Sequence, residues 1–327
     1  MKISIDGGAL CENKNRYGNY VFSRNLITAL YLYDQRNDYT VYGFCMKPSW
    51  LKERQRFRYQ QIMPKRFWSS VRLSIEQIVH PNDIFLALNQ AIPLYTSEKV
   101  ITFCHGLAYY FYPQYYSKED VIRLNKQLKE IIKRSNKIIV SSQKVKDELV
   151  SINQLIDRKI QVIPFGIPFD MDNSIKRKVS KSKDKFFLYV GMNHQIKNIE
   201  FIKRACKEFK KNKKYKDYKL YNITTNLLRN KLKKLYQSAT ALLTASHYES
   251  FNLPVLEALS QGCPVIGLKS AIIPELKKYV NVATNKKMFV KLMIKAGNNT
   301  LKTNFSKEIK RKFTWKNYVK MIINKLS

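Results

Sequence analysis

The chain has 327 residues, of which 45% are hydrophobic, and it carries a formal net charge of +36. This apolar content is enough for packed cores, so the composition excludes a disordered chain, and the length suggests two domains. No apolar run is long enough to cross a bilayer, and we expect no signal peptide, because Met1 leads directly into a strand-like segment.

The first half of the sequence alternates strand-like and helix-like segments. Helices are predicted at 19–32, where apolar residues recur with a period of 3.6, in the basic segment 118–135, and after Ser142, a suitable cap. Strands are predicted for short apolar runs at 2–6, 39–44, 100–104, 137–140 and 161–164. Such alternation predicts a doubly wound, parallel α/β sheet, in which ligands bind at the carboxyl ends of the strands.

The segment from Lys47 to Leu73 interleaves aromatic and basic side chains. An anionic membrane surface attracts such segments, but the pattern fits equally well a solvated face with ordinary core aromatics. The residues concerned are Trp50, Arg54, Arg56, Phe57, Arg58, Tyr59, Lys65, Arg66, Phe67, Trp68 and Arg72. A basic chain also attracts nucleic acid, but no nucleic-acid-binding motif is present, so no specific nucleic-acid partner is expected.

The second half begins after a polar, lysine-rich connector, Asp170–Lys185. A strand is predicted at 186–190, ending at Gly191, and Lys197 follows it closely. A further short strand at 220–224 is followed almost at once by a predicted helix at 227–237. The order of elements again predicts a parallel α/β domain.

Two carboxylates, Glu249 and Glu257, are separated by seven residues that include Pro254. The run Ala241–Ala245 predicts a buried strand before them, and the apolar spacing after Pro254 predicts a helix that ends near Gly262. We therefore expect Glu249 on the loop and Glu257 on the first turn of the helix. Two glutamates near a helix start would also be explained by the helix dipole alone.

The residues between the two glutamates form a candidate anion site. The backbone N–H groups of Phe251, Asn252 and Leu253 are predicted to point outward without helical partners, beside the positive end of the helix. A diphosphate is the ligand that such a helix start suits best.

Cysteine and histidine usage gives no sign of a metal site. The odd number of cysteines and the absence of CxxC spacing predict free thiols in a reducing cytoplasm, without disulfides and without zinc. Three histidines follow predicted strands, so a three-histidine site is conceivable, but no metal is expected. The cysteines are Cys11, Cys45, Cys104, Cys206 and Cys263, and the three histidines are His105, His194 and His247.

The stretch around Glu249 and Glu257 resembles the E-x7-E signature of the family-4 retaining glycosyltransferases, which have a GT-B fold. The resemblance continues to Glu275 and is also found at Asp6–Leu10, Gly18–Tyr20 and Phe103–Leu107. It implies two Rossmann-like domains that face each other across a cleft, with a C-terminal helix that returns to the first. The implied domains are 1–170, with 306–327 returning to it, and 171–305.

The resemblance also implies roles for individual residues. Glu257 would bind the nucleotide ribose, Glu249 would approach the donor sugar, and Lys197 would neutralise the donor diphosphate. His105 would contact the donor sugar from the first domain, although a core histidine satisfied by the backbone is the alternative. Gly18 belongs to the glycine loop of the donor site. The remaining implied donor-binding residues are Phe251, Asn252 and Leu253.

The implied activity is that of a retaining hexosyltransferase. It would move a sugar from a nucleoside-diphosphate sugar to a hydroxyl of a glycan or lipid-linked acceptor, without a metal or cofactor, in the cytoplasm or at an anionic membrane surface. Met192 and Ile196 stand where many members have arginine, and the segment 219–236 is short. A non-catalytic GT-B subunit therefore stays open as an alternative, as does, from charge alone, a basic nucleic-acid-binding protein.

Overall fold

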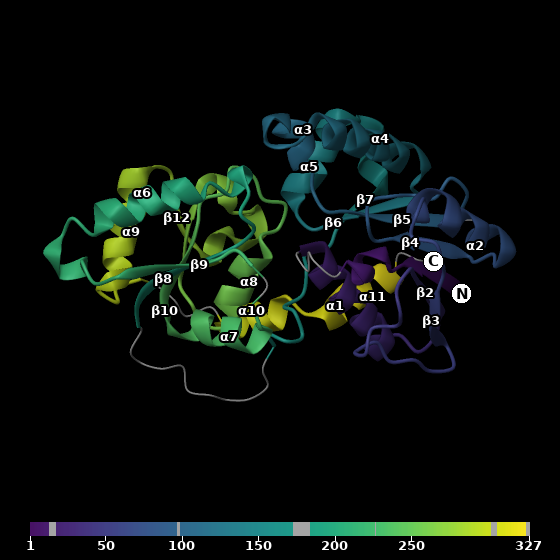
Figure 1. Cartoon of the computed structure of the whole chain (residues 1–327), viewed down its shortest axis with the longest axis horizontal. Helices are drawn as coiled ribbons and strands as arrows, with labels where there is room; N and C mark the ends of the chain where they lie inside the picture. The colour runs from purple at the N-terminus through teal and green to yellow at the C-terminus, as the bar shows by residue number, and fades with distance from the viewer. Residues whose placement is uncertain (13–17, 97–98, 173–183, 226, 302–305, 325–327) are drawn as a thin grey trace. The chain divides into compact units, whose positions relative to one another are not determined.

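The computed structural model describes residues 1–12, 18–96, 99–172, 184–225, 227–301 and 306–324 (Figure 1). The chain forms two compact units, of which the first comprises Met1–Pro164 and Trp315–Ser327 and the second Phe165–Thr314. Each unit is built around one parallel sheet, with helices on both of its faces. This is the predicted α/β architecture.

The unit boundaries differ slightly from the predicted ones. The first lies after Pro164, compared with 170 in the prediction, and most of the predicted connector 170–185 lies outside the described residues. The segment that returns to the first unit begins at Trp315 rather than at 306. The reason is that α10 (Ser306–Lys312) packs against α8 (Leu253–Ser260) and therefore belongs to the second unit.

The first unit contains a sheet in the order β3-β2-β1-β4-β5-β6-β7, and all neighbouring strands are parallel. The strand order reverses direction next to β1, which pairs with both β2 and β4. In open α/β sheets such a reversal is the usual place for a ligand. The strands are β1 (Lys2–Asp6), β2 (Asp38–Gly43), β3 (Phe57–Gln61), β4 (Ile84–Ala87), β5 (Lys99–Cys104), β6 (Lys137–Val140) and β7 (Ile160–Val162).

Helices cover both faces of this sheet because successive strand residues point to opposite sides. On β5, Phe103 contacts Phe22 of α1, whereas Cys104 joins a buried cluster with Leu128 of α4. Figure 1 shows α1 and α11 on one face and α3, α4 and α5 on the other. The helices of this unit are α1 (Gly18–Tyr33), α2 (Leu73–Val79), α3 (Ala108–Phe111), α4 (Lys118–Arg134), α5 (Gln143–Ile152) and α11 (Trp315–Ile323).

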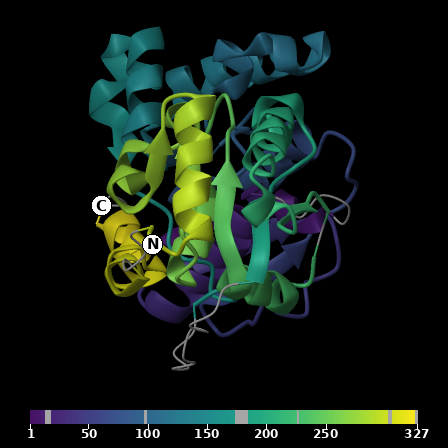
Figure 2. The ribbon, with the colours of Figure 1, turned by 90° about the vertical axis from the view of Figure 1, so that its left-hand side faces the viewer.

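The second unit contains a parallel sheet in the order β12-β11-β10-β8-β9. Helices α6 and α9 lie against one face of this sheet (Figure 2). The main core of the unit lies between them, and Phe187, Phe209 and Phe289 are buried there together. The strands are β8 (Asp184–Val190), β9 (Lys219–Ile223), β10 (Ala239–Thr244), β11 (Val265–Leu268) and β12 (Asn281–Ala283). The helices, besides α8 and α10, are α6 (Ile199–Phe209), α7 (Arg229–Ser238) and α9 (Lys286–Gly297).

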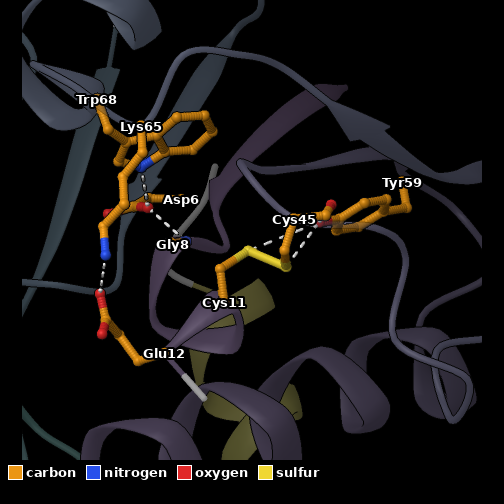
Figure 3. Close-up of a disulfide and its surroundings, with 8 residues drawn as sticks. All are labelled: Asp6, Gly8, Cys11, Glu12, Cys45, Tyr59, Lys65 and Trp68. Carbon is orange, nitrogen blue, oxygen red and sulfur yellow. Dashed lines mark hydrogen bonds and ion pairs between the residues drawn. A yellow bond between two sulfur atoms is a disulfide. The ribbon is translucent and has the colours of Figure 1, made fainter. Parts of the chain in front are cut away.

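The expectation that all cysteines are free thiols is wrong for two of them. Cys11 and Cys45 form a disulfide, with their Cα atoms 5.3 Å apart (Figure 3). The parallel pairing of β1 with β2 brings the segments that follow these strands together, although the two cysteines are 34 residues apart in sequence. Sequence spacing alone cannot show such a juxtaposition. Cys104, Cys206 and Cys263 are free and buried.

Candidate functional site

In the second unit, the loop after β8 is fastened to the loop after β10. The backbone N–H of His247 donates to the carbonyl oxygen of Ile196 at 2.8 Å, and the side chain of Asn198 donates to the carbonyl oxygen of Ala245 at 3.1 Å. Asn198 has φ 52°, a left-handed conformation that asparagine tolerates better than most residues. These contacts place Lys197, on the first loop, beside Glu249, on the second.

Lys197 and Glu249 form an ion pair. The distance from Lys197 Nζ to Glu249 Oε1 is 2.8 Å, and both side chains are largely buried. The hydroxyl of Ser246 donates to the same carboxylate oxygen at 2.7 Å. The structure therefore brings together two of the predicted site residues, and it holds the ammonium group of Lys197 against a carboxylate.

The loop between the two glutamates is anchored by Asn252. This residue has φ 67°, and its side-chain amide donates to Thr244 Oγ1 and to the carbonyl oxygen of Ala271, both at 3.1 Å. Among the described residues, none accepts a hydrogen bond from the backbone N–H of Phe251, Asn252 or Leu253. Phe251 is buried as a whole residue, with 1% of its surface exposed, and its phenyl ring packs against Phe165. Asn252 is buried as well, at 9%, so the structure does not show the N–H groups of these two residues facing outward, as the sequence predicts.

The sequence predicts Glu257 on the first turn of its helix, but in the structure it lies beyond the first turn of α8. The left-handed Asn252 precedes a helix that starts at Leu253, one residue before the proline, so Glu257 is the fifth helical residue. It is buried, with 3% of its surface exposed. Burial raises the pKa of this carboxyl, and the nearby Arg229 guanidinium opposes that effect.

Both carboxylate oxygens of Glu257 have a partner on α7. Arg229 Nη2 lies 2.6 Å from Oε1, and the hydroxyl of Tyr236 donates to Oε2 at 3.0 Å. The same Arg229 nitrogen lies 3.0 Å from Asp170 Oδ1. Arg229 could not be singled out from the sequence, because its relation to Glu257 depends on how α7 packs against α8 and not on any local pattern.

The other two predicted site residues, His105 and Gly18, belong to the first unit. His105 follows β5, and its Nε2 lies 2.7 Å from the carbonyl oxygen of Leu88. Burial lowers the pKa of its imidazole to about 4, so the ring is neutral near pH 7. Gly106, which follows, has φ 124°, a conformation that glycine adopts more readily than a residue with a side chain.

Gly18 is the first residue of α1, and packing does not demand a glycine there. A Cβ atom added to Gly18 would meet no heavy atom of the described residues within 4 Å. At Gly8, in contrast, a Cβ atom would lie 2.8 Å from Trp68 Nε1 and 3.1 Å from Asp6 Oδ1. Packing therefore requires a glycine at position 8. At position 18 the packing of the described residues leaves room for a side chain.

The described residues gather no group of three His, Cys, Asp or Glu side chains suited to a metal ion. What they do provide, in the second unit, is the Lys197–Glu249 ion pair, the buried Glu257, and a helix start whose backbone N–H groups at residues 251–253 have no acceptor among the described residues. A lysine and the N–H groups of a helix start, at the carboxyl ends of parallel strands, are groups that bind phosphate in α/β folds.

Comparison with known proteins gives the family. Residues 29–170 match the model of Glycosyltransferase Family 4, and residues 221–312 match that of Glycosyl transferases group 1. The chain belongs to this family of GT-B glycosyltransferases.

Characterised relatives are similar over part of their length. The O-antigen chain mannosyltransferase RfbU of Salmonella typhimurium is 25% identical over 68% of this chain, and O-antigen chain mannosyltransferase B of Escherichia coli is 21% identical over 67%. The chain covers 64% of each of these two proteins.

Solved structures share the whole fold. Sucrose-phosphate synthase from Thermosynechococcus elongatus superposes with a TM-score of 0.70 at 13% identity, covering 99% of this chain and 98% of its own. Anabaena HepE in complex with UDP and glucose gives a TM-score of 0.68 at 12% identity, covering 100% of this chain and 99% of its own. At such identities the likeness supports the GT-B fold alone.

Proposed function

We propose that the protein is a retaining glycosyltransferase that moves a sugar from a nucleoside-diphosphate sugar to an acceptor hydroxyl. The observation that carries this assignment is the Lys197–Glu249 ion pair on the loops that precede α8, together with the start of that helix, where no described group accepts from the backbone N–H groups of Phe251–Leu253. A lysine and a set of backbone donors provide what a diphosphate leaving group needs as negative charge develops on it.

In the proposed reaction the bond between the anomeric carbon and the diphosphate breaks, and the acceptor oxygen bonds to that carbon on the same face. The departing phosphate takes the acceptor proton, as the family resemblance implies. Lys197 and the loop amides stabilise the phosphate, and Glu257 binds the ribose. The reaction uses no metal and no cofactor besides the donor.

The acceptor is proposed to be a glycan or a lipid-linked glycan. Two relatives are named as O-antigen chain mannosyltransferases, which supports an acceptor of this class. Both matching family models describe transferases, so neither a non-catalytic subunit nor a nucleic-acid-binding protein is favoured.

The test is thermal unfolding with UDP, GDP, ADP and several of their sugars at matched ionic strength. A ligand that binds only the folded state raises the melting temperature, and we expect such a shift with one of the bases. The shift should disappear in Glu257→Ala, whose melting temperature without ligand serves as its own baseline. No shift with any nucleotide would contradict the assignment.

We also propose that the protein associates with an anionic membrane surface. Within the basic and aromatic segment 47–73, Phe57 and Trp68 are core residues, so the segment cannot contact a membrane along its whole length. Phe67, however, is 62% exposed, and the side chains of Lys65 and Arg66 beside it are exposed as well. A membrane contact would therefore be confined to the C-terminal end of this segment.

Phe67 begins an exposed apolar stripe. Its other members, about one helical turn apart, are Val71, Ile75 and Ile78. Leu94, 72% exposed, lies alongside, because its backbone N–H donates to the carbonyl oxygen of Ser70 at 3.1 Å. An apolar stripe next to basic side chains is suited to insertion among anionic head groups. No described helix is long and apolar enough to span a bilayer.

Vesicle flotation tests this association. We expect binding to anionic vesicles that weakens with salt and is lost in the double variant Phe67→Ser/Ile75→Ser. Leu155→Ser is the matched control, because Leu155 is an apolar residue of the same unit that is 89% exposed outside the stripe. Equal binding to neutral and anionic vesicles would contradict the electrostatic part.

A further inference from the structure

Glu257, the residue that binds the ribose in the proposed reaction, is held by two residues of α7. Arg229 Nη2 lies 2.6 Å from its Oε1, and the hydroxyl of Tyr236 donates to its Oε2 at 3.0 Å. Tyr236 has no exposed surface, and Glu257 has 3%. Both contacts are therefore made in a protein interior, where the low dielectric strengthens a hydrogen bond to a charged group.

The buried carboxyl group needs a cation beside it to stay ionised. Burial raises the pKa of Glu257, and the guanidinium of Arg229 opposes that effect. A protonated carboxyl group is a donor at one oxygen, whereas the ionised group accepts at both. Ribose hydroxyls donate to a carboxylate, so the ionised form of Glu257 is the one suited to bind them.

Arg229 is also held from its other side. The same nitrogen lies 3.0 Å from Asp170 Oδ1, and the side chain of Asp170 is partly exposed. The segment that carries Asp170 is fastened to the end of α8, because the side chain of Gln261 donates to the carbonyl oxygen of Met171 at 2.7 Å. The guanidinium thus lies between two carboxylates whose positions are fixed relative to α8.

Among the described residues, the other elements packed against α8 add little charge near Glu257. Strands β10 and β11 contain no titratable side chain, and on α10 the carboxylate of Glu308 pairs with Lys278. The charge of Asp170 raises the pKa of Glu257, opposite to the effect of Arg229. The ionisation of Glu257 therefore depends on Arg229 above all.

We propose that Arg229 and Tyr236 are positioning residues that keep Glu257 as an oriented acceptor for the ribose hydroxyls, and that they thereby set the preference of the site for ribonucleotides. Each partner takes one lone pair of one carboxylate oxygen and leaves a second lone pair on that oxygen for the ribose. The inference rests on the nucleotide-sugar function proposed above. It gives α7 a part in the selection of the donor.

The test compares a nucleotide with its own 2′,3′-dideoxy form. Titration calorimetry gives the affinities for UDP, GDP and ADP and for the dideoxy form of each, and the ratio within a pair measures the contribution of the ribose hydroxyls. Because both members carry the same base and diphosphate, the ratio is insensitive to phosphate contacts and to overall stability. In the unmodified protein we expect a ratio of about tenfold or more for the nucleotide that binds.

Arg229→Gln should lower this ratio at pH 7. Without the guanidinium the pKa of Glu257 rises further, so the ratio should recover as the pH is raised toward about 9 and the carboxyl group ionises. A residue with a purely structural role would not produce this recovery. Arg229→Lys retains a cation and should keep most of the ratio, and it also serves as the test if Arg229→Gln does not fold.

Asp170→Asn is the matched control, because it removes the other carboxylate from the same guanidinium. It leaves the contact of Arg229 with Glu257 in place and takes away a charge that raises the pKa of Glu257, so the ratio should be unchanged or larger. Tyr236→Phe removes a single hydroxyl group and should lower the ratio by about threefold.

The possible outcomes separate this inference from the proposed function. An unchanged or larger ratio in Arg229→Gln would overturn the inference, because Arg229 would then cover Glu257 instead of preparing it. A loss that is the same at every pH, or an equal loss in Asp170→Asn, would overturn it as well. Failure of the unmodified protein to bind any of the nucleotides would instead count against the proposed function.

Discussion

Arg229 is shared between two carboxylates: its Nη2 lies 2.6 Å from Glu257 Oε1 and 3.0 Å from Asp170 Oδ1. Glu257 is almost fully buried, so its ionised form depends on this guanidinium. The residue that binds the ribose in the proposed reaction is therefore oriented by a residue on a different helix.

Replacing Arg229 should destabilise the protein. Arg229→Gln leaves a buried carboxylate without its cation, which we expect to lower the free energy of unfolding by about 2–4 kcal/mol at pH 7. Urea unfolding measures this difference. Lys203→Gln, which breaks an exposed ion pair with Glu200, is the control and should cost less than about 1 kcal/mol. Equal effects of the two substitutions would show that the burial of Glu257 is unimportant.

The loss of stability caused by Arg229→Gln should become smaller as the pH falls. Burial already raises the pKa of Glu257 in the folded protein, and loss of the guanidinium raises it further. A raised carboxyl pKa favours the folded state at low pH, where the group is protonated. The difference in stability between the variant and the unmodified protein should therefore shrink as the pH falls from 8 toward the ordinary glutamate range. A difference that grows on acidification would contradict the pairing.

Substitutions of Lys197 and Glu249 should have opposite effects on nucleotide binding. Lys197→Ala removes the cation and should weaken the binding of a nucleoside diphosphate about tenfold or more. Glu249→Gln releases Lys197 from its partner while retaining an acceptor for Ser246, so diphosphate binding should be equal or tighter although transfer falls. Titration calorimetry separates the two. Weaker binding in both variants would mean that Glu249 itself contacts the nucleotide.

Thiol counting tests the disulfide. Unfolded without reductant, the chain should show only the thiols of Cys104, Cys206 and Cys263. Linking residues 34 apart in sequence restricts the unfolded chain, so reduction should lower the free energy of unfolding by about 3–4 kcal/mol. Cys11→Ser should give the same loss in the absence of reductant. Five reactive thiols in the purified protein would contradict the bond.

Gly8 and Gly18 should respond differently to alanine. Gly8→Ala places a methyl group against Trp68 and Asp6 and should cost about 1–3 kcal/mol. Gly18→Ala has room among the described residues, so stability should be unchanged. If its turnover nevertheless falls, Gly18 is needed for a ligand. Denaturation and activity measured on the same preparations distinguish these outcomes.

Much of the fold could be predicted because its signals are local. Ser117 and Ser142 cap α4 and α5, and both helices begin within one residue of the predicted place. The central strand β4 was missed, because its four apolar residues, Ile84–Ala87, have no alternating pattern. Short apolar runs of this kind cannot be assigned from periodicity.

The site was predictable only where a motif spans it. Lys197 and Glu249 follow from the family resemblance, and the structure pairs them. The contact of Arg229 with Glu257 and the bond between Cys11 and Cys45 depend on which strands and helices become neighbours. No pattern within a short window carries that information.

The packing of α11 against α1 also affects how the protein is made. Trp315 and Tyr318 of the last helix lie against the ring of Phe22, near the start of the chain. A ribosome releases the second unit in full before it releases α11. During synthesis the second unit can therefore reach its native state first, while the face of α1 that holds Phe22 stays uncovered and open to chaperones until α11 has been released.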